Sequence, residues 1–186
     1  IMYTLHNHDF QGKSPRIDKE AFLAPQAVVL GDVEIGKYAS IWPAAVVRGD
    51  VSYIKIGDYS NVQDTACLHV ETNGPCIIGR FVTIGHGAIV HACTVEDNVL
   101  IGMNATVLSG AKIGSGSIIA AGALVKENAV IPQNSLVTGI PGQIKKTIDR
   151  LDSIHAQAVK YKTLWSVGYG LAPELGGETY HGENII

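Results

Sequence analysis

Three histidines, His69, His86 and His91, are the residues of this chain whose type and spacing could do chemistry. Neutral imidazole is a ligand for zinc and for several other divalent ions. Three such ligands leave a zinc ion one open position, where a bound water acquires a pKa of about 7. The histidines therefore predict a metal centre if the fold brings their side chains together.

A six-residue repeat decides how these side chains lie. Most successive aliphatic positions are six residues apart, and the spacing changes only after Val47, Leu68 and Val90, at intervals that are multiples of three hexads. Three equivalent sides per turn, with loops tolerated at one corner, predict a triangular parallel β-solenoid over residues 17–140. The repeating positions are Ile17, Leu23, Val29, Ile35, Ile41, Val47, Ile56, Val62, Leu68, Ile78, Ile84, Val90, Val95, Ile101, Val107, Ile113, Ile119, Val125, Ile131 and Val137.

The repeat stacks two of the histidines. Arg48, His69 and His91 each follow the corner position of three successive turns, and coils stack about 4.8 Å apart. His69 and His91 are therefore expected to be vertical neighbours, with Arg48 one level beyond. His86 lies on another side of the coil, and most of one side of the triangle separates it from His91, so the three are not expected to share a metal within one chain. Between chains packed around a threefold axis, the three could meet.

Further polar residues lie near the two surfaces that would meet in such a packing. Gln63 and Asp64 are expected directly under Gly85 and His86 on the second side of the coil. Arg48 and Asp50 flank the corner that carries the histidine pair. These charges fit either a catalytic role or plain salt bridging between subunits.

These motifs resemble the gamma-class carbonic anhydrase family. The resemblance rests on R-G-D at residues 48–50, Q-D at 63–64, His69 five residues later and G-H-x-x-x-x-H at 85–91. It covers residues 17–165. It implies an all-β solenoid that is a left-handed parallel β-helix of hexapeptide repeats, with a C-terminal α-helix. It also implies a homotrimer with three metal sites at its interfaces.

The resemblance further implies a reaction and a role for each residue. His69 and His91 would bind the metal from one subunit and His86 from its neighbour. The reaction would be reversible hydration of CO₂ to bicarbonate by a hydroxide on the metal. Gln63 would orient that hydroxide, while Arg48 and Asp50 would form an intersubunit ion pair near the substrate. Zn²⁺ is the expected cofactor, although three histidines also suit Fe²⁺ or Co²⁺.

Three positions bear on the details of this mechanism. Asp64 is a candidate for the carboxylate that fixes the tautomer of a metal-binding histidine. The most active members of the family carry Glu after the aspartate of R-x-D, whereas this chain has Val51. Their acidic loop after the first histidine holds a proton-transfer glutamate, and the short loop here has one acid, Glu71. We therefore expect proton removal to limit turnover and activity to be low.

Two other functions stay open from the sequence. A hexapeptide acyltransferase would use one histidine as a general base and bind coenzyme A along the coils. Such an enzyme would carry a long loop with a single histidine and no partner histidine on the next coil, unlike this chain. A metal-binding trimer without significant catalytic activity would have the same ligand residues, so the sequence does not separate it from the enzyme.

The remaining segments are expected to flank the solenoid. Residues 1–16 form a polar N-terminal segment along the first coil. After Pro141-Gly142, residues that step by three or four predict one amphipathic helix over 141–168 that packs on an open side of the solenoid. Its buried stripe is expected to hold Ile144, Ile148, Leu151, His155, Ala158, Tyr161 and Trp165. Glycines then mark a flexible tail over 169–186.

Composition excludes several classes of function. The net charge of −3 and pI near 6.2 give no basic surface for nucleic acid or anionic lipid. No apolar stretch reaches the roughly 18 residues of a membrane span. Three cysteines, an odd number, favour a reducing compartment, so the cytoplasm is the expected location.

Overall fold

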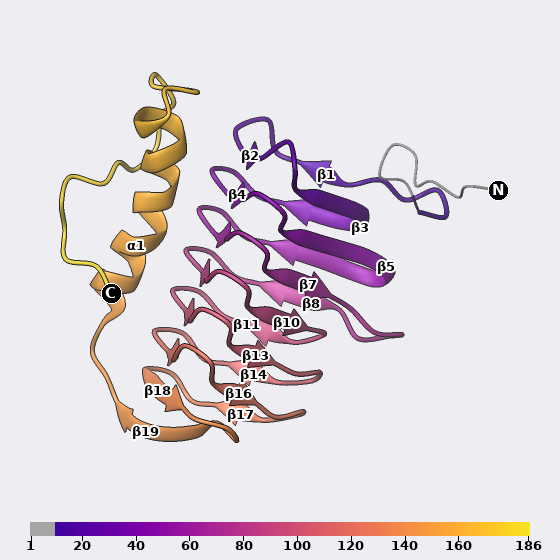
Figure 1. The fold of residues 1–186 in the computed structure, drawn as a ribbon, viewed down its shortest axis with the longest axis vertical. Helices are drawn as coiled ribbons and strands as arrows, with labels where there is room; N and C mark the ends of the chain where they lie inside the picture. The colour runs from indigo at the N-terminus through magenta and orange to yellow at the C-terminus, as the bar shows by residue number, and fades with distance from the viewer. Residues whose placement is uncertain (1–9) are drawn as a thin grey trace.

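The computed structural model describes residues 10–186, which form a three-sided coil with one helix beside it (Figure 1). Strands of successive coils pair in parallel, so each coil lies directly on the one before it. The fold is the left-handed parallel β-helix of hexapeptide repeats that the six-residue spacing and the resemblance predicted. Residues 1–9 of the expected N-terminal segment lie outside the described part of the chain.

The strands stack into three faces, which we name by their outward features. The histidine face holds the first half of β3 (Val28–Ile35), the first half of β5 (Val46–Ile56), β7 (Cys67–His69), β10 (Ile89–His91), β13 (Thr106–Val107) and β16 (Leu124–Val125). The charged face holds β1 (Arg16–Ile17), the second halves of β3 and β5, β8 (Cys76–Ile78), β11 (Thr94–Val95), β14 (Lys112–Ile113) and β17 (Val130–Ile131). The helix face holds β2 (Phe22–Leu23), β4 (Ser40–Ile41), β6 (Asn61–Val62), β9 (Thr83–Ile84), β12 (Leu100–Ile101), β15 (Ile118–Ile119), β18 (Ser135–Thr138) and β19 (Gln143–Thr147).

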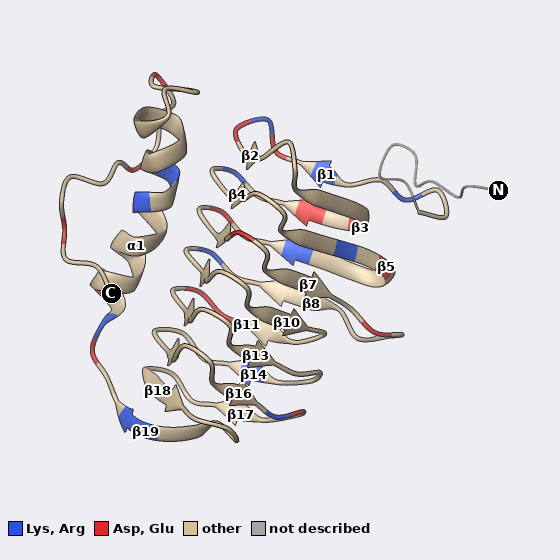
Figure 2. Ribbon diagram, viewed as in Figure 1, with Lys and Arg blue, Asp and Glu red and all other residues tan. Residues whose placement is uncertain are grey.

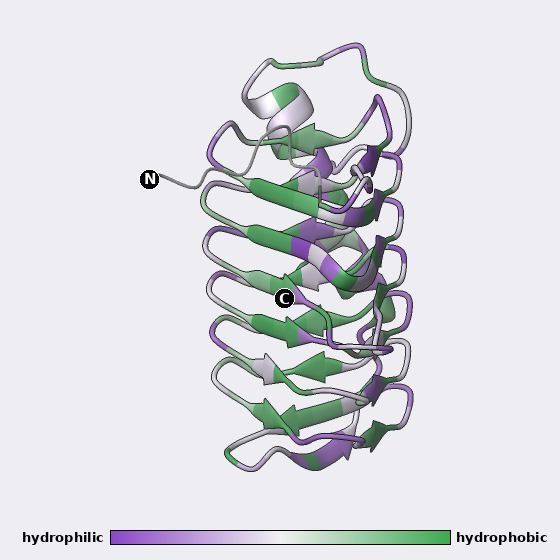
Figure 3. Ribbon diagram, turned by 90° about the vertical axis from the view of Figure 1, so that its right-hand side faces the viewer, coloured by the Kyte–Doolittle hydropathy of each residue, from purple (hydrophilic) through white to green (hydrophobic). Residues whose placement is uncertain are grey.

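The repeating aliphatic side chains fill the interior of the coil. From Val29 to Val137, every repeat position is at most 7% exposed, which confirms the inward direction predicted from the spacing. Ile17 is 41% exposed on β1, which among residues 10–186 pairs with β3 alone. Hydrophobic strands separated by more hydrophilic turns are visible along the whole coil in Figure 3. Burial of this column is the main contribution to the stability of the solenoid.

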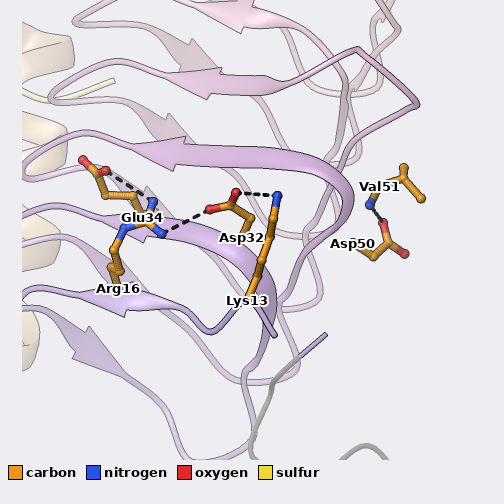
Figure 4. Close-up of polar contacts among 6 residues, drawn as sticks. All are labelled: Lys13, Arg16, Asp32, Glu34, Asp50 and Val51. Carbon is orange, nitrogen blue, oxygen red and sulfur yellow. Dashed lines mark hydrogen bonds and ion pairs between the residues drawn. The ribbon is translucent and has the colours of Figure 1, made fainter. Parts of the chain in front are cut away.

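The charged face begins with a ladder of ion pairs. The guanidinium of Arg16 lies 3.7 Å from the carboxylate of Glu34, and Lys55 lies 3.3 Å from the same carboxylate one coil further on. Asp32 binds Lys13 and Arg16 at 3.1 and 3.2 Å (Figure 4). Figure 2 shows acidic residues on β3 and basic residues on the neighbouring strands β1 and β5. Most of these side chains are well exposed, so each pair contributes little to stability.

The C-terminal helix begins later than the sequence predicted. Residues Gln143–Thr147 form β19, which pairs antiparallel with β18, and α1 covers only Leu151–Thr163 before a π-helical turn, η1 (Leu164–Gly168). The last coil would otherwise present an unpaired strand edge, and β19 supplies the missing hydrogen bonds. Ile144, assigned to the buried helical stripe, is instead 50% exposed on this strand. Among residues 10–186, no helix is long and apolar enough to cross a membrane.

Helix α1 packs on a ladder of aromatic side chains at one corner of the coil. Tyr38, Tyr59 and Phe81, which we call the aromatic ladder, occupy equivalent turns at φ of 62°, 60° and 54°. Their ring centroids are 4.8 Å apart at each step, and His155 of α1 stacks on Phe81 at 4.0 Å. Left-handed backbone is unusual for aromatic residues. The close packing under the helix explains why these turns carry them.

The C-terminal tail packs against the helix and the aromatic ladder, contrary to the expectation of a flexible segment. The backbone N–H of Glu178 donates to the hydroxyl of Tyr59 at 2.8 Å, and its carboxylate lies 2.7 Å from His155 Nε2. Further along, the N–H of Tyr180 donates to Thr163 Oγ1 at 2.8 Å. The tail is therefore an ordered segment bound to the rest of the protein. Its glycines allow turns, and the sequence pattern alone did not distinguish such a segment from a flexible one.

Replacing Phe81 with alanine tests the aromatic ladder. Phe81 is 7% exposed and lies between Tyr59 and His155, so Phe81→Ala should lower the free energy of unfolding by about 3–5 kcal/mol in urea denaturation. Tyr53→Ala is the matched control, because Tyr53 is 47% exposed and should change stability by only about 0.5 kcal/mol. Equal effects of the two substitutions would show that the ladder does not hold the helix.

Candidate metal centre

The stacking of coils brings three site residues into one column. His91 pairs with His69 between β10 and β7, and His69 pairs with Arg48 between β7 and β5. The column lies at the end of the histidine face, where each strand turns the loop-bearing corner. The structure therefore places Arg48, His69 and His91 as the repeat predicted.

The two histidine rings of this column face one another through nitrogen atoms. His69 Nδ1 lies 3.1 Å from His91 Nε2, and the ring centroids are 5.1 Å apart. Two nitrogen ligands of one tetrahedral zinc ion are about 3.3–3.4 Å apart, given bonds of about 2.0–2.1 Å. The separation therefore fits two ligands of a single divalent ion.

Asp50 holds His69 from the other side of its ring. His69 Nε2 lies 3.0 Å from Asp50 Oδ1, while the other carboxylate oxygen binds Arg48. The backbone N–H of Val51 donates to Asp50 Oδ1 at 2.9 Å (Figure 4). Partial burial opposes ionisation, but hydrogen bonds from His69 and Val51 and the charge of Arg48 hold the pKa of Asp50 below its ordinary value. An ionised carboxylate only accepts, so it fixes the proton of His69 on Nε2 and leaves Nδ1 with a lone pair.

Ser109 holds His91 in a comparable way, and the sequence did not point to it. Ser109 Oγ lies 2.9 Å from His91 Nδ1. The serine follows Val107, which stacks next to Val90, so the repeat places it one coil beyond His91. Stacking alone would not have found it, because Val107 pairs with Val90 and the position equivalent to His91 is therefore Leu108.

His86 lies apart from the column and is paired with Asp64. It follows β9, and its Nδ1 lies 2.9 Å from Asp64 Oδ2, with 44% and 42% of the two side chains exposed. Because the carboxylate accepts from Nδ1, the lone pair of His86 is on Nε2, which points away from Asp64. In residues 10–186 of one chain, no three His, Cys, Asp or Glu side chains are close enough to hold a metal ion.

Gln63 is buried beside the turn that carries His86. It is 3% exposed, and its Nε2 donates to Asn61 Oδ1 at 3.1 Å, while Asn61 Nδ2 donates to Thr83 Oγ1 at 3.0 Å. These hydrogen bonds use the amide nitrogen of Gln63 as a donor, and its Oε1 remains available as an acceptor. A cavity of about 320 Å³ borders Gln63, Gly85 and Tyr161 between the helix face and α1. Asn61 and Thr83 were not singled out from the sequence, because buried polar residues of a strand resemble ordinary repeat positions.

Glu71 lies outside this arrangement. Its backbone pairs with Gly74 at the tip of the loop after β7, with N–O distances of 3.1 and 2.8 Å, and its side chain is exposed. Val51 is also exposed, at 53%. The two positions expected to limit proton transfer therefore offer one solvated carboxylate and one apolar side chain.

The outward side of the histidine face is apolar. The outward residues of its successive coils are Val28, Val46, Cys67, Ile89, Thr106 and Leu124. Val28 and Ile89 are 38% and 46% exposed, whereas the first coils of the neighbouring face carry the outward charges of Arg16, Glu34 and Lys55. An exposed apolar stripe of this kind is typical of a surface that meets another protein chain.

Known proteins share both the fold and the sequence of this chain. A family profile described as "Bacterial transferase hexapeptide (six repeats)" matches residues 92–127. The curated "Probable carbonic anhydrase" of Methanocaldococcus jannaschii is 52% identical over 150 residues, which cover 80% of this chain and 94% of that protein. "Gamma carbonic anhydrase 1, mitochondrial" of Arabidopsis thaliana is 46% identical over 107 residues, covering 54% of this chain and 39% of that longer protein.

Solved structures give the same fold with more varied names. The "hexapeptide transferase family protein" of Anaplasma phagocytophilum is 38% identical, with a TM-score of 0.81 and coverage of 84% of this chain and 93% of that one. The N-acyltransferase AntD of Bacillus cereus, at 19% identity and a TM-score of 0.60, covers 78% of this chain and 87% of its own and shares the fold alone.

Fold and sequence together define a hexapeptide-repeat β-helix with two histidines stacked at one corner of its coil. The identity to the M. jannaschii protein over nearly its whole length then decides the family. This chain belongs to the gamma-class carbonic anhydrase family, which confirms the resemblance drawn from its motifs.

Substituting Asp50 tests the electrostatics of the column. Because its pKa is lowered in the folded state, the charged carboxylate stabilises the fold above about pH 4, and this contribution is lost as the pH falls through the folded pKa. Asp50→Asn should therefore lower the free energy of unfolding at about pH 6 by about 1–3 kcal/mol, with a smaller difference at about pH 3. The measurement is urea denaturation across this range.

Glu71→Gln is the control, because Glu71 is exposed and should change stability little at any pH. If the deficit of Asp50→Asn were the same at both ends of the pH range, the charge of Asp50 would not be what holds the column.

Proposed function

We propose that this chain catalyses the reversible hydration of CO₂ to bicarbonate at a divalent metal ion shared between subunits of a homotrimer. His69 and His91 of one subunit and His86 of its neighbour would hold the ion. The observation that carries the proposal is the contact of His69 Nδ1 and His91 Nε2 at 3.1 Å, each ring being held from behind by Asp50 or Ser109. Zn²⁺ fits these donors, as do Fe²⁺ and Co²⁺.

The bound ion would supply a water whose pKa is lowered from 15.7 to about 7, so that a nucleophile is available at neutral pH. The protein would do the rest. Gln63 would accept a hydrogen bond from the attacking water through its free Oε1 and so aim the water at CO₂. Arg48, held by Asp50, would place a positive charge near the anionic product. Asp64 would keep His86 in the tautomer that binds through Nε2.

The trimer is proposed because the two halves of the site lie on different surfaces. The histidine column borders the apolar histidine face, whereas His86 is exposed on another side of the same chain. A contact between two different surfaces is head-to-tail, and such contacts form a closed ring when the rotation between subunits closes. A ring of three would bury Ile89 and the rest of the apolar stripe while completing three sites.

Two features support low turnover. Val51 and the solvated Glu71 provide no internal route for the proton released from water.

All three cysteines, Cys67, Cys76 and Cys93, are free thiols in the structure. This agrees with a reducing compartment, and the cytoplasm is the location that we propose.

Acyl transfer is less well supported than hydration. A relative with 38% identity is named a hexapeptide transferase, and an acyltransferase shares the fold at 19% identity. A general base needs one lone pair aimed at a substrate hydroxyl or amine. In this chain the nitrogens of His69 and His91 are aimed at each other and at their partners Asp50 and Ser109.

Stopped-flow CO₂ hydration after reconstitution with Zn²⁺, Fe²⁺ or Co²⁺ tests this function. We expect metal-dependent activity that rises with the concentration of imidazole buffer, because an external base must carry the proton. His91→Ala should lose both metal and activity. His181→Ala, at an exposed position of the tail, should keep both.

Full metal occupancy without hydration would show a metal-binding assembly that does not catalyse this reaction. A fast rate that is indifferent to buffer would keep the reaction but contradict the account of proton transfer, since an internal route would then exist.

A further inference from the structure

We propose that Thr83 is a positioning residue of the hydration reaction, whose hydroxyl holds the side-chain amide of Asn61 and, through Asn61, the amide of Gln63. This inference rests on the proposed function, in which Gln63 aims the attacking water. It adds a residue that lies on the next coil and that the motifs of the chain do not include.

Three polar side chains form a continuous chain of hydrogen bonds on the helix face. Gln63 Nε2 donates to Asn61 Oδ1 at 3.1 Å, and Asn61 Nδ2 donates to Thr83 Oγ1 at 3.0 Å. Gln63, Asn61 and Thr83 are 3%, 0% and 2% exposed, so bulk water competes little for these contacts. The position of the Gln63 amide therefore depends on Asn61, and that of the Asn61 amide depends on Thr83.

The backbone of the coil fixes the threonine end of this chain. Thr83 lies on β9 between β6 and β12, where it pairs with Asn61 on one side and Leu100 on the other. Its N–H donates to the carbonyl of Val99 at 3.0 Å, and the N–H of Asn61 donates to the carbonyl of Val82 at 2.8 Å. The β-branched side chain of threonine is also restricted at χ1. A well-fixed strand thus presents the hydroxyl to Asn61.

Thr83 is the last polar member of its column. The outward residues on successive coils of the helix face are Ser40, Asn61, Thr83, Leu100 and Ile118. The side chain of Leu100, next to Thr83, forms no hydrogen bond. The hydroxyl of Ser40, on the other side of Asn61, accepts from Trp42 Nε1 at 2.9 Å. Among residues 10–186, Thr83 Oγ1 is the one hydrogen-bond partner of Asn61 Nδ2.

Loss of the Thr83 hydroxyl would act on the reaction through Gln63. Asn61 Nδ2 would be buried without a partner, which favours rotation of its side chain. Gln63 Nε2 would then lose the acceptor that holds it, and Gln63 Oε1 would no longer be fixed relative to the attacking water. Misplacement by about 1 Å, caused by a change remote from the reacting atoms, costs about 100-fold in rate.

CO₂ hydration by the assembled protein, reconstituted with Zn²⁺, tests this role. Thr83→Val keeps the shape of the side chain and removes the hydroxyl, so it should lower kcat/KM for CO₂ about 10–100-fold. Thr83→Ser keeps the hydroxyl and should remain within about threefold of the unaltered protein. Thr94→Val is the matched control, since Thr94 also precedes an inward valine but lies on the charged face, away from Gln63, and it should leave kcat/KM unchanged.

The dependence on buffer separates this role from a general loss of active protein. Proton transfer to the buffer follows the hydration step, so it limits kcat at low buffer concentration but does not enter kcat/KM for CO₂. Thr83→Val should therefore lower kcat/KM much more than it lowers kcat at low buffer concentration. Equal losses in the two parameters would contradict the role, because a smaller amount of folded enzyme lowers both alike.

A double-mutant cycle tests whether Thr83 acts through Asn61. Thr83 borders the same cavity as Gln63, so a direct contact with the substrate has to be distinguished from positioning. In an Asn61→Ala background, Thr83→Val should lower kcat/KM by less than about twofold, because the hydrogen bond that it removes is already lost. A full loss in that background would overturn the positioning role.

NMR of the side-chain amide groups provides a measurement that does not depend on activity. The amide resonances of Asn61 and Gln63 should both shift in Thr83→Val and keep their positions in Thr94→Val. In the unaltered protein, the amide protons of Asn61 and Gln63 should exchange slowly with water. Rapid exchange would overturn the chain of hydrogen bonds even if Thr83→Val fails to fold.

The outcomes separate this inference from the proposed function. Unshifted Gln63 resonances in Thr83→Val, or a kcat/KM within about threefold of the unaltered protein, would overturn the role of Thr83 and leave the proposed function standing. Absence of CO₂ hydration by the unaltered protein in any buffer would overturn the proposed function, and with it this role, even where the resonances shift as expected.

Discussion

Parallel stacking of coils at the spacing of about 4.8 Å is the constraint on which the rest of this structure depends. It places residues of equal position in the repeat directly above one another, so that a column forms wherever equivalent positions carry related side chains. One column is the aliphatic interior, and another is the aromatic ladder that receives α1. A third is the column of Arg48, His69 and His91. The same periodic backbone therefore builds the core, the helix contact and the candidate metal centre.

The fold and half of the site follow from this periodicity. The aliphatic positions predicted the buried interior. The equal position of His69 and His91 in the repeat, directly after a corner residue, predicted that they would be neighbours. Membership of the gamma-class carbonic anhydrase family, inferred from R-G-D, Q-D and the histidine spacing, is confirmed by a relative 52% identical over most of this chain. Positions that repeat strictly are thus predictable even without a structure.

Features that depend on contacts between distant segments were not predictable in this way. Ile144 matched a helical stripe by spacing, but its segment instead forms β19, which pairs with the otherwise open edge of β18. Tyr59 and Phe81 occupy turns where glycine or asparagine is usual, and only the docked helix explains them. The tail looked flexible from its glycines, yet Glu178 binds Tyr59 and His155. Side-chain hydrogen bonds such as that from Gln63 to Asn61 also could not be predicted from the sequence.

The site that we propose would be divided by the same geometry that builds it. A rigid solenoid cannot bend to bring His86 to the column, so the structure of one chain holds two unlike halves: a paired-histidine corner and a His86–Asp64 pair. Each half is held in place by its own carboxylate. Assembly would then join elements that are already arranged, which limits the conformational entropy lost when the ion binds.

Subunit complementation tests this divided site most directly. His86→Ala chains keep the column and His91→Ala chains keep His86, so dissociating and reassembling an equal mixture should restore about one quarter of the metal bound by the unaltered protein, given random closure of rings. A mixture of His69→Ala and His91→Ala chains damages the same half twice and should restore none. Absence of metal in the first mixture, once mixed assemblies are shown by mass spectrometry, would contradict a site shared between subunits. So would equal recovery in both mixtures.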